Sequence, residues 1–282
     1  MRATLRFLAF PGLVGIAIVL LVTLGRIGFD AVLATPVMWS LIFCLLVVLE
    51  RLIPFERAWF APDGQLAHDF AHTFLGSAVG SRLGALGADM VVAGVAAALP
   101  AISTIWPTSW PVWLQIAAAY AGLDLLRYWQ HRVQHASGPL WETHKLHHDS
   151  RRLTTVKTGR SHPFDRAFQA LCVVPLAMVG APTSVLFYCV GLNSIIGLIG
   201  HANIDVRMGP LEFIFVGPPQ HRVHHSVDPA DHHSNFGASL TIWDRAFGTF
   251  RNREARTVGL EEATSPRLLG QLAAPINAWL GY

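Results

Sequence analysis

The sequence predicts an all-α integral membrane protein, with four to six transmembrane or re-entrant helices and a histidine-rich helical cap on the cytoplasmic side. Three observations predict this fold class. The 282 residues are 52% hydrophobic and only 14% charged, whereas soluble domains carry about 25% charged residues. Several uncharged runs are long enough to cross a bilayer. All but two of the fourteen histidines lie between His131 and His233.

Two runs near the start of the sequence, 7–25 and 31–49, each contain nineteen residues without a charge. A helix needs about 20 mostly apolar residues to cross the hydrocarbon core of a bilayer, so each run predicts one span. Two arginines precede the first run, as in a signal peptide, but no small-residue cleavage site follows it. We therefore expect an uncleaved membrane anchor.

Two longer uncharged runs, 90–123 and 167–200, contain thirty-four residues each. As a single helix, either run would be about 51 Å long, which exceeds one crossing. Three prolines interrupt the first run and a Gly-Ala-Pro turn interrupts the second. We therefore expect two helical hairpins, the first of which also uses residues 73–88.

The loops 50–68, 124–166 and 201–282 contain nearly all of the lysines and arginines. The hairpin scheme places these loops on one side of the membrane, and the positive-inside rule makes that side cytoplasmic. The histidine cluster is then cytoplasmic as well. A net charge of +3 without a dense basic stripe argues against a nucleic-acid partner.

Three histidine motifs predict metal binding. They are HRVQH (His131, His135), HKLHH (His144, His147, His148) and HRVHH (His221, His224, His225). Residues three and four apart share one face of a helix, so each HxxHH motif is expected to direct three imidazoles to one locus. Imidazole is a ligand for Zn, Cu, Fe and Ni. One ion cannot use all eight rings, so we expect two metals. A lone HxxxH pair would instead be read as two surface histidines.

Nearby carboxylates are expected to orient the imidazole N–H groups rather than to bind metal directly. The candidates are Asp124, Asp149, Asp165, Asp231 and Asp244. The alternative for each is a loop cap or a salt bridge. Spacing alone does not identify the ion, since affinity order by itself favours Zn or Cu over Fe.

The three motifs, with Asn235-Phe236-Gly237 and the segment Ile242–Phe250 (IWDRAFGTF), resemble the fatty acid hydroxylase / sterol desaturase superfamily. The resemblance is specific over about 118–254. It implies a catalytic core there within an integral membrane region of residues 69–282, and N-terminal anchor helices in residues 1–68.

The resemblance implies a membrane enzyme with two Fe ions (Fe2+/Fe3+). Such an enzyme uses O2 and electrons from a separate donor protein to hydroxylate or desaturate a lipid that enters from the bilayer. The implied ligands are His131, His135, His144, His147, His148, His162, His201, His221, His224 and His225. Additional ligands or orienting groups are His232, His233, Asp124, Asp149 and Asp244. No catalytic residue beyond the ligands is expected.

Two other functions remain open at this point. His144 to Asp149 reads HxxxxD, the pattern of a glycerolipid acyltransferase, although it leaves most of the histidines unexplained. A metal-binding or metal-transport protein would explain the imidazoles, but transporters hold their ligands near the membrane midplane. The sequence contains no four-cysteine iron–sulfur spacing and no GxGxxG motif, so we expect electrons to come from another protein.

Overall fold

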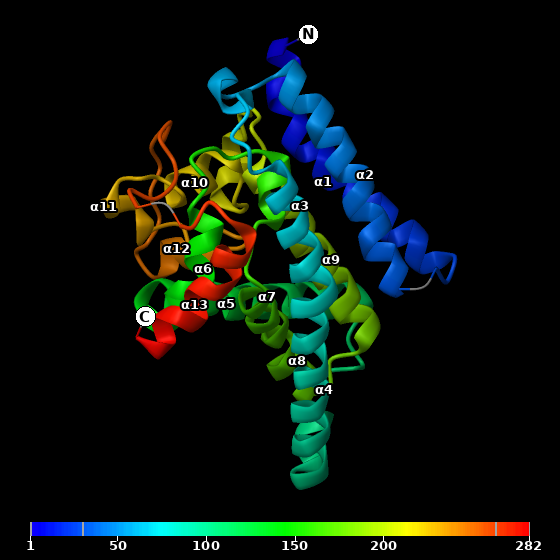
Figure 1. Ribbon diagram of the computed structural model, residues 1–282. Helices are drawn as coiled ribbons and strands as arrows, with labels where there is room; N and C mark the ends of the chain where they lie inside the picture. Colours follow the sequence, from blue (N-terminus) through cyan, green and yellow to red (C-terminus); the bar gives the residue numbers. More distant parts are fainter. Residues whose placement is uncertain (1, 30, 263, 282) are drawn as a thin grey trace.

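A computed structural model describes residues 2–29, 31–262 and 264–281, and the regular elements among them are all helices (Figure 1). This confirms the all-α prediction. Four segments are long and apolar enough to cross a membrane, which agrees with the lower end of the expected number. They are Arg2–Arg26, Leu33–Leu52, Leu66–Ala98 and Thr183–His201.

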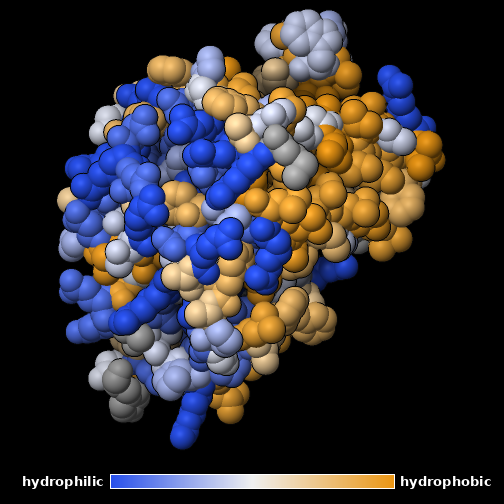
Figure 2. Space-filling model, turned by 90° about the horizontal axis from the view of Figure 1, so that it is seen from above, coloured by the Kyte–Doolittle hydropathy of each residue, from blue (hydrophilic) through white to orange (hydrophobic). Residues whose placement is uncertain are grey.

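Helices α1 (Arg2–Arg26) and α2 (Ala31–Leu52) pack on each other and on α9 (Thr183–His201). The inner face of α2 follows the helical repeat, because Met38, Ile42 and Leu46 are four residues apart and fully buried. The outer faces expose apolar side chains. In Figure 2 hydrophobic residues gather on the side of α1 and α2, and hydrophilic residues on the side of the short helices.

Helices α3 (Leu66–Leu75) and α4 (Ser81–Ala98) continue each other through a π-helical turn at Gly76–Gly80. Helix α4 packs on α7 (Pro163–Ala170) and α8 (Val174–Met178). A Cβ atom on Gly84 would lie 2.4 Å from the carbonyl oxygen of Ala167. Glycine is therefore required at this contact, as is common where helices approach closely in membranes.

The two expected hairpins do not form as predicted. Helix α5 (Val112–Ala136) packs on α9, whereas α4 packs on α7 and α8. The second run, 167–200, holds only one long helix, α9. Its first part forms the end of α7, a short 3-10 turn and the five-residue α8. Pro175 and the turn at Gly180-Ala181-Pro182 interrupt this part of the run, and they leave too few residues for a second span.

The part of the molecule beside the ends of α5 and α9 is built from short helices. They are α6 (Gly138–His148), α10 (Pro218–His224), α11 (Pro229–His232), α12 (Ile242–Ala246) and α13 (Leu268–Leu280). Helix α6 packs on α5, α7 and α13, and α10 packs on α9. The histidine motifs of α6 and α10 therefore meet the histidine-bearing ends of α5 and α9.

Buried carboxylates fix the loops between these elements. Glu50, near the end of α2, accepts hydrogen bonds from the backbone N–H of Thr155 at 2.7 Å and of Asn203 at 2.8 Å. Asp124 of α5 accepts from the backbone N–H of Ser239 at 2.9 Å and from the side-chain amide of Asn193 at 2.9 Å. A buried charge is tolerated only when it is hydrogen-bonded, so these contacts hold the loops in fixed positions.

Candidate metal centre

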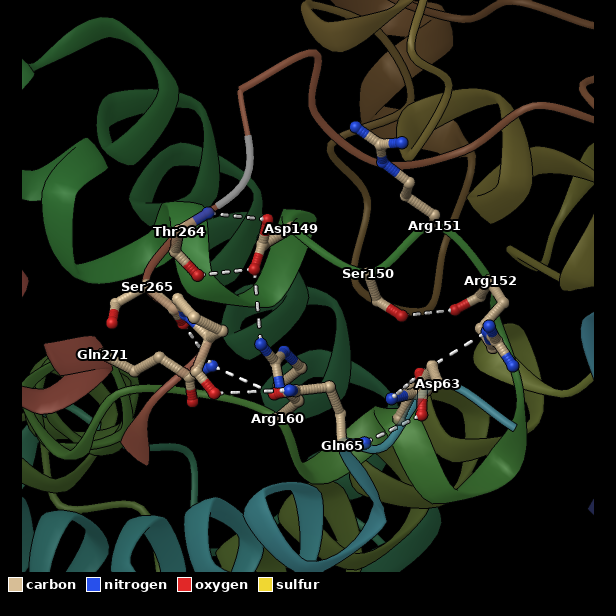
Figure 3. Close-up of a pocket in the computed structure, with 12 residues that line it drawn as sticks. Asp63, Gln65, Asp149, Ser150, Arg151, Arg152, Arg160, Thr264, Ser265 and Gln271 are labelled. Atoms are coloured by element: carbon tan, nitrogen blue, oxygen red, sulfur yellow. Dashed lines mark hydrogen bonds and ion pairs between the residues drawn. The ribbon is translucent and has the colours of Figure 1, made fainter. Parts of the chain in front are cut away.

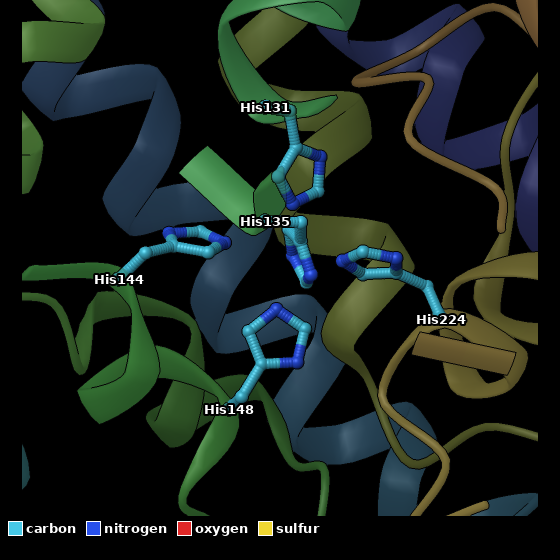
Figure 4. Close-up of side chains that lie close together, drawn as sticks. All are labelled: His131, His135, His144, His148 and His224. Carbon is cyan, nitrogen blue, oxygen red and sulfur yellow. The ribbon is translucent and has the colours of Figure 1, made fainter. Parts of the chain in front are cut away.

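Nine histidines form two adjacent groups. The five-histidine group contains His131, His135, His144, His148 and His224, whose rings converge in Figure 4. The four-histidine group contains His147, His201, His221 and His225. Within each group, one ring nitrogen from every member lies within 4.8 Å of the others. Helices α5, α6 and α10 supply the first group, and α6, α9 and α10 the second.

Each HxxHH motif is divided between the two groups, which corrects the expectation that its three rings share one locus. In α6, His144 and His148 face the five-histidine group while His147 faces the four-histidine group. In and just after α10, His221 and His225 share one group while His224 faces the other. Positions i+3 and i+4 lie about 100° apart around a helix, so the motif can serve two neighbouring centres.

Backbone carbonyl groups orient four of these nine rings. His131 Nδ1 donates to Phe236 at 2.9 Å, and His224 Nδ1 donates to Ser234 at 2.7 Å. His147 Nδ1 donates to Arg160 at 3.2 Å, and His201 Nδ1 to Gly197 at 2.7 Å. A carbonyl oxygen can only accept, so Nδ1 carries the proton in all four rings. Each Nε2 atom is left with a free lone pair.

These lone pairs make the four-histidine group suitable for a cation. The Nε2 atoms of His147 and His201 lie 3.0 Å apart, and neither bears a proton. Two lone pairs at this distance repel each other unless a cation lies between them. Further Nε2 contacts join His201 to His221 at 2.9 Å and His221 to His225 at 3.1 Å. Imidazoles that bind one ion at about 2.0–2.1 Å place adjacent nitrogens about 3 Å apart.

The five-histidine group is also suitable for a cation, because several of its ring nitrogens lack a hydrogen-bond partner. The Nε2 atoms of His131, His135, His144 and His224, and both ring nitrogens of His148, are buried without a hydrogen-bond partner. Leaving so many polar atoms unpaired would be costly. A metal ion that accepts these lone pairs removes the cost. The residues present therefore fit a metal in both groups.

Burial keeps these rings neutral. Desolvation, together with the neighbouring imidazoles, holds the pKa values of His148, His224 and His225 well below their ordinary value. The two groups are also in contact, because the rings of His148 and His225 stack with centroids 4.2 Å apart. Neutral imidazoles in adjacent groups are the form required for ligating two metals close together.

The other three expected histidines lie outside both groups. His162 precedes α7, where its Nδ1 accepts from the Phe164 N–H at 3.2 Å and its Nε2 donates to the Leu272 carbonyl at 3.1 Å. Both of its ring nitrogens are thus occupied. The ring of His232 lies 6.1 Å from His148, and the exposed His233 lies 6.1 Å from His135. These two flank the five-histidine group without joining it.

The expected carboxylates have other partners. Asp124 holds the Ser239 loop, Asp149 binds Arg160 at 3.3 Å, and Asp244 accepts from the Phe236 N–H at 2.8 Å. None of these three contacts a histidine in the described part of the chain, because each satisfies loop N–H groups or a cation instead. Asp231 pairs with Arg253.

Asp165 is the carboxylate that meets a ring of the centre. Its Oδ1 accepts from His144 Nδ1 at 3.4 Å and from the Gln134 side chain at 2.6 Å. Burial alone would raise the pKa of Asp165, but His144, Arg166 and Gln134 hold it below its ordinary value. An ionised Asp165 therefore orients His144 so that Nε2 faces the five-histidine group.

Sequence reasoning missed the carbonyl acceptors, since every residue carries the same backbone group. One weak signal exists in the Asn235-Phe236-Gly237 segment. Asn235 is the non-glycine residue with a positive φ, 51°, among those described, and its side chain receives the Arg251 N–H at 2.8 Å. This strained turn directs the Phe236 carbonyl to His131. Among aromatic residues, Trp141 packs against His135, with ring centroids 5.0 Å apart.

Fold and site together define a helical membrane protein with a double histidine centre, and comparisons with known proteins give its family. The fatty acid hydroxylase family model matches residues 116–249, which contain both histidine groups. An ornithine lipid hydroxylase of Rhizobium tropici is 35% identical over 240 residues, covering 83% of this chain and 72% of the relative. No solved structure matches the chain significantly.

More distant relatives match a shorter segment. Alkylglycerol monooxygenase of Xenopus tropicalis is 33% identical over 145 residues, covering 51% of this chain and 31% of the relative. Methylsterol monooxygenase 1 of Rattus norvegicus is 24% identical over 129 residues, or 45% of this chain and 43% of the relative. The chain belongs to the fatty acid hydroxylase family, which confirms the resemblance found in its motifs. It is an oxidoreductase.

We predict that Asp165→Asn weakens metal binding while the chain stays folded. The amide keeps the size of the carboxylate but loses its charge, so it orients His144 less firmly. Replacing such an orienting partner typically costs about 10- to 100-fold in metal affinity. Competition with a chelator measures the change, and Asp89→Asn, at an exposed position of α4 outside both groups, is the matched control. Unchanged affinity in Asp165→Asn would contradict the role given to this residue.

We predict that the metal-free protein loses stability as the pH falls below about 6.5. The unfolded histidines titrate near that value, whereas His148, His224 and His225 have lowered pKa values in the fold. The unfolded state therefore binds more protons below pH 6.5, and the free energy of unfolding falls. Thermal unfolding in detergent between pH 7.5 and 5 tests this, and a constant midpoint would refute it.

Proposed function

We propose that this protein is an integral membrane di-iron oxidoreductase that hydroxylates a lipid, using O2 and electrons from a separate donor protein. The observation that carries the proposal is the pair of adjacent, buried histidine groups with unprotonated ring nitrogens facing inward. The family, and the hydroxylase and monooxygenase names of its relatives, support this chemistry. In such a reaction one oxygen atom enters a C–H bond and the other leaves as water, with two electrons and two protons consumed.

The nine grouped histidines would hold the irons, five around one and four around the other. Bound iron would supply the oxidising power needed to attack an unactivated C–H bond. The protein's own contribution is to hold the rings in one tautomer and to keep water out. The carbonyl groups of Phe236, Ser234, Arg160 and Gly197 do the first, and burial of the rings does the second.

Lipid is the substrate class that the surroundings favour. Of the four apolar segments that are long enough to span a membrane, α9 ends at His201, a member of the four-histidine group. A substrate dissolved in the bilayer beside α9 would therefore lie close to the centre. The relatives are named for ornithine lipid, alkylglycerol and methylsterol, which all combine a polar end with a long apolar body.

We further propose the arrangement in the membrane. Residues 1–68 form N-terminal anchor helices, residues 69–282 form the integral membrane catalytic region, and the core lies within about 118–254. The histidine groups face the cytoplasm, because the loops beside them carry most of the lysines and arginines. A soluble electron donor would approach from that side.

The acyltransferase alternative has little support from the site. In the HxxxxD interpretation, Asp149 would orient His144 as a base. Instead the Nδ1 atom of His144 meets Asp165, while Asp149 binds Arg160 and the Thr264 N–H at 3.0 Å. His144 also belongs to the five-histidine group. The observed partners leave no His–Asp pair for acyl transfer in this motif.

We predict that the protein purified after expression with ample iron holds about two iron ions per chain. Two separate groups of imidazoles with free lone pairs lead to this number. Elemental analysis of detergent-purified, folded protein measures it. A reproducible value near one would contradict the dinuclear proposal, and full occupancy by zinc alone would contradict the choice of iron.

We predict that His147→Ala and His224→Ala each abolish lipid hydroxylation, because each removes a ring from a different group. His68→Ala should keep most of the activity, since the His68 ring bonds Gln65 at 3.0 Å, away from both groups. Product formation in membranes with matched protein levels, O2 and a reductant is the measurement. An inactive His68→Ala beside an active His147→Ala would require the site to be redrawn.

A further inference from the structure

A polar cavity of about 280 Å³ adjoins the metal centre. It lies between the loop after α6, the turn at Thr155–Gly159, the loop before α3 and the start of α13 (Figure 3). Four basic side chains line it, against two acidic ones. The basic residues are Arg151, Arg152, Lys157 and Arg160; the acidic residues are Asp63 and Asp149. The proposed function assigns no role to this cavity.

The carboxylates around the cavity are already shared among its cations. Lys157 Nζ binds Asp63 at 2.7 Å and the buried Asp69 at 2.5 Å. Arg160 binds Asp69 at 3.0 Å and Asp149 at 3.3 Å. Three carboxylates thus face four basic groups, and the cavity retains an excess of positive charge.

Arg151 carries this excess charge, and Arg160 adds a hydrogen-bond donor that has no partner. The exposed guanidinium of Arg151 contacts no carboxylate in the described part of the chain, and its hydrogen-bond acceptor is the Glu261 carbonyl at 3.4 Å. Arg160 is 3% exposed, yet its Nε atom has no hydrogen-bond partner. An anion in the cavity would pair with the guanidinium of Arg151 and accept a hydrogen bond from Arg160 Nε.

One wall of the cavity lies beside the ends of two apolar segments. Asp63 and Gln65, on one wall, belong to the loop that joins the apolar segments Leu33–Leu52 and Leu66–Ala98. Polar head groups of lipids gather where apolar spans end. A lipid can therefore place its head group in the cavity while its chains stay in the bilayer.

The cavity also shares a wall with the metal centre. The carbonyl oxygen of Arg160 accepts from His147 Nδ1 at 3.2 Å, while the guanidinium of the same residue lines the cavity. Asp149 directly follows His148 at the end of α6. A head group bound here would therefore lie next to both histidine groups.

We propose that this cavity binds the anionic group, a carboxylate or phosphate, of the substrate lipid's head group. The inference rests on the proposed function and narrows its substrate class to lipids that carry an anionic group at their polar end. Arg151 would contact the anion, and Arg160 would face it from the buried side, whereas Arg152 Nε is already paired with Asp63 at 3.4 Å. Binding the head group at this point would fix which part of the lipid reaches the metals.

Binding of short-chain probes to the full-length, detergent-purified protein tests the proposal without relying on turnover. The probes are N-octanoyl-ornithine, octyl phosphate, the uncharged 1-O-octylglycerol and inorganic phosphate. We expect octyl phosphate and the zwitterionic N-octanoyl-ornithine, which both carry an anionic group, to bind at least tenfold more tightly than octylglycerol. Arg151→Ala should weaken their binding about tenfold or more, because it removes a hydrogen bond to a charged group. Arg151→Lys should restore most of the affinity.

Arg57→Ala is the matched control, because Arg57 is also exposed but lies in η1 (Arg57–Phe60), outside the cavity. Equal binding of charged and uncharged probes would overturn the proposal. So would equal losses in Arg57→Ala and Arg151→Ala, or inorganic phosphate binding as tightly as octyl phosphate. If anionic probes bind as expected while iron-loaded protein oxidises no lipid, the proposed function fails and the binding site stands.

Discussion

The structure depends on holding unprotonated imidazole nitrogens face to face in a buried space. Such an arrangement is repulsive by itself, as the 3.0 Å contact between the Nε2 atoms of His147 and His201 shows. It persists because the opposite nitrogen of each of these rings is tied to a backbone carbonyl, and that of His144 to Asp165, which fixes the tautomer and the orientation. A cation in each group converts this repulsion into binding.

The rest of the fold serves to bring these acceptors to the rings. Apart from Gly197, which lies in α9, the acceptors belong to loops, which would be mobile without anchors. Asp244 binds the N–H groups of Phe236 and Gly237, both at 2.8 Å, and so positions the carbonyl that His131 needs. Glu50 fixes the turn that leads to Arg160. Carboxylates thus orient the rings mainly indirectly, because they fix the backbone whose carbonyl groups bind the rings.

The bilayer and the metal centre meet at the ends of the long helices. His201 is the last residue of α9, whose other face packs on α1 and α2. The loop between α2 and α3 lines the charged cavity beside His147 and His148.

The membrane-embedded helical class, the family and the candidates for the converging histidines all follow from the sequence alone, because hydrophobic length and helical spacing are local properties. How the rings divide between two groups follows only from the folded chain, since residues i+3 and i+4 can face different neighbours. The same holds for His162, which caps α7, and for Asp124, Asp149 and Asp244, which hold loops. A histidine's acceptor is usually a distant backbone carbonyl, as with His131 and Phe236, and no side-chain pattern records it.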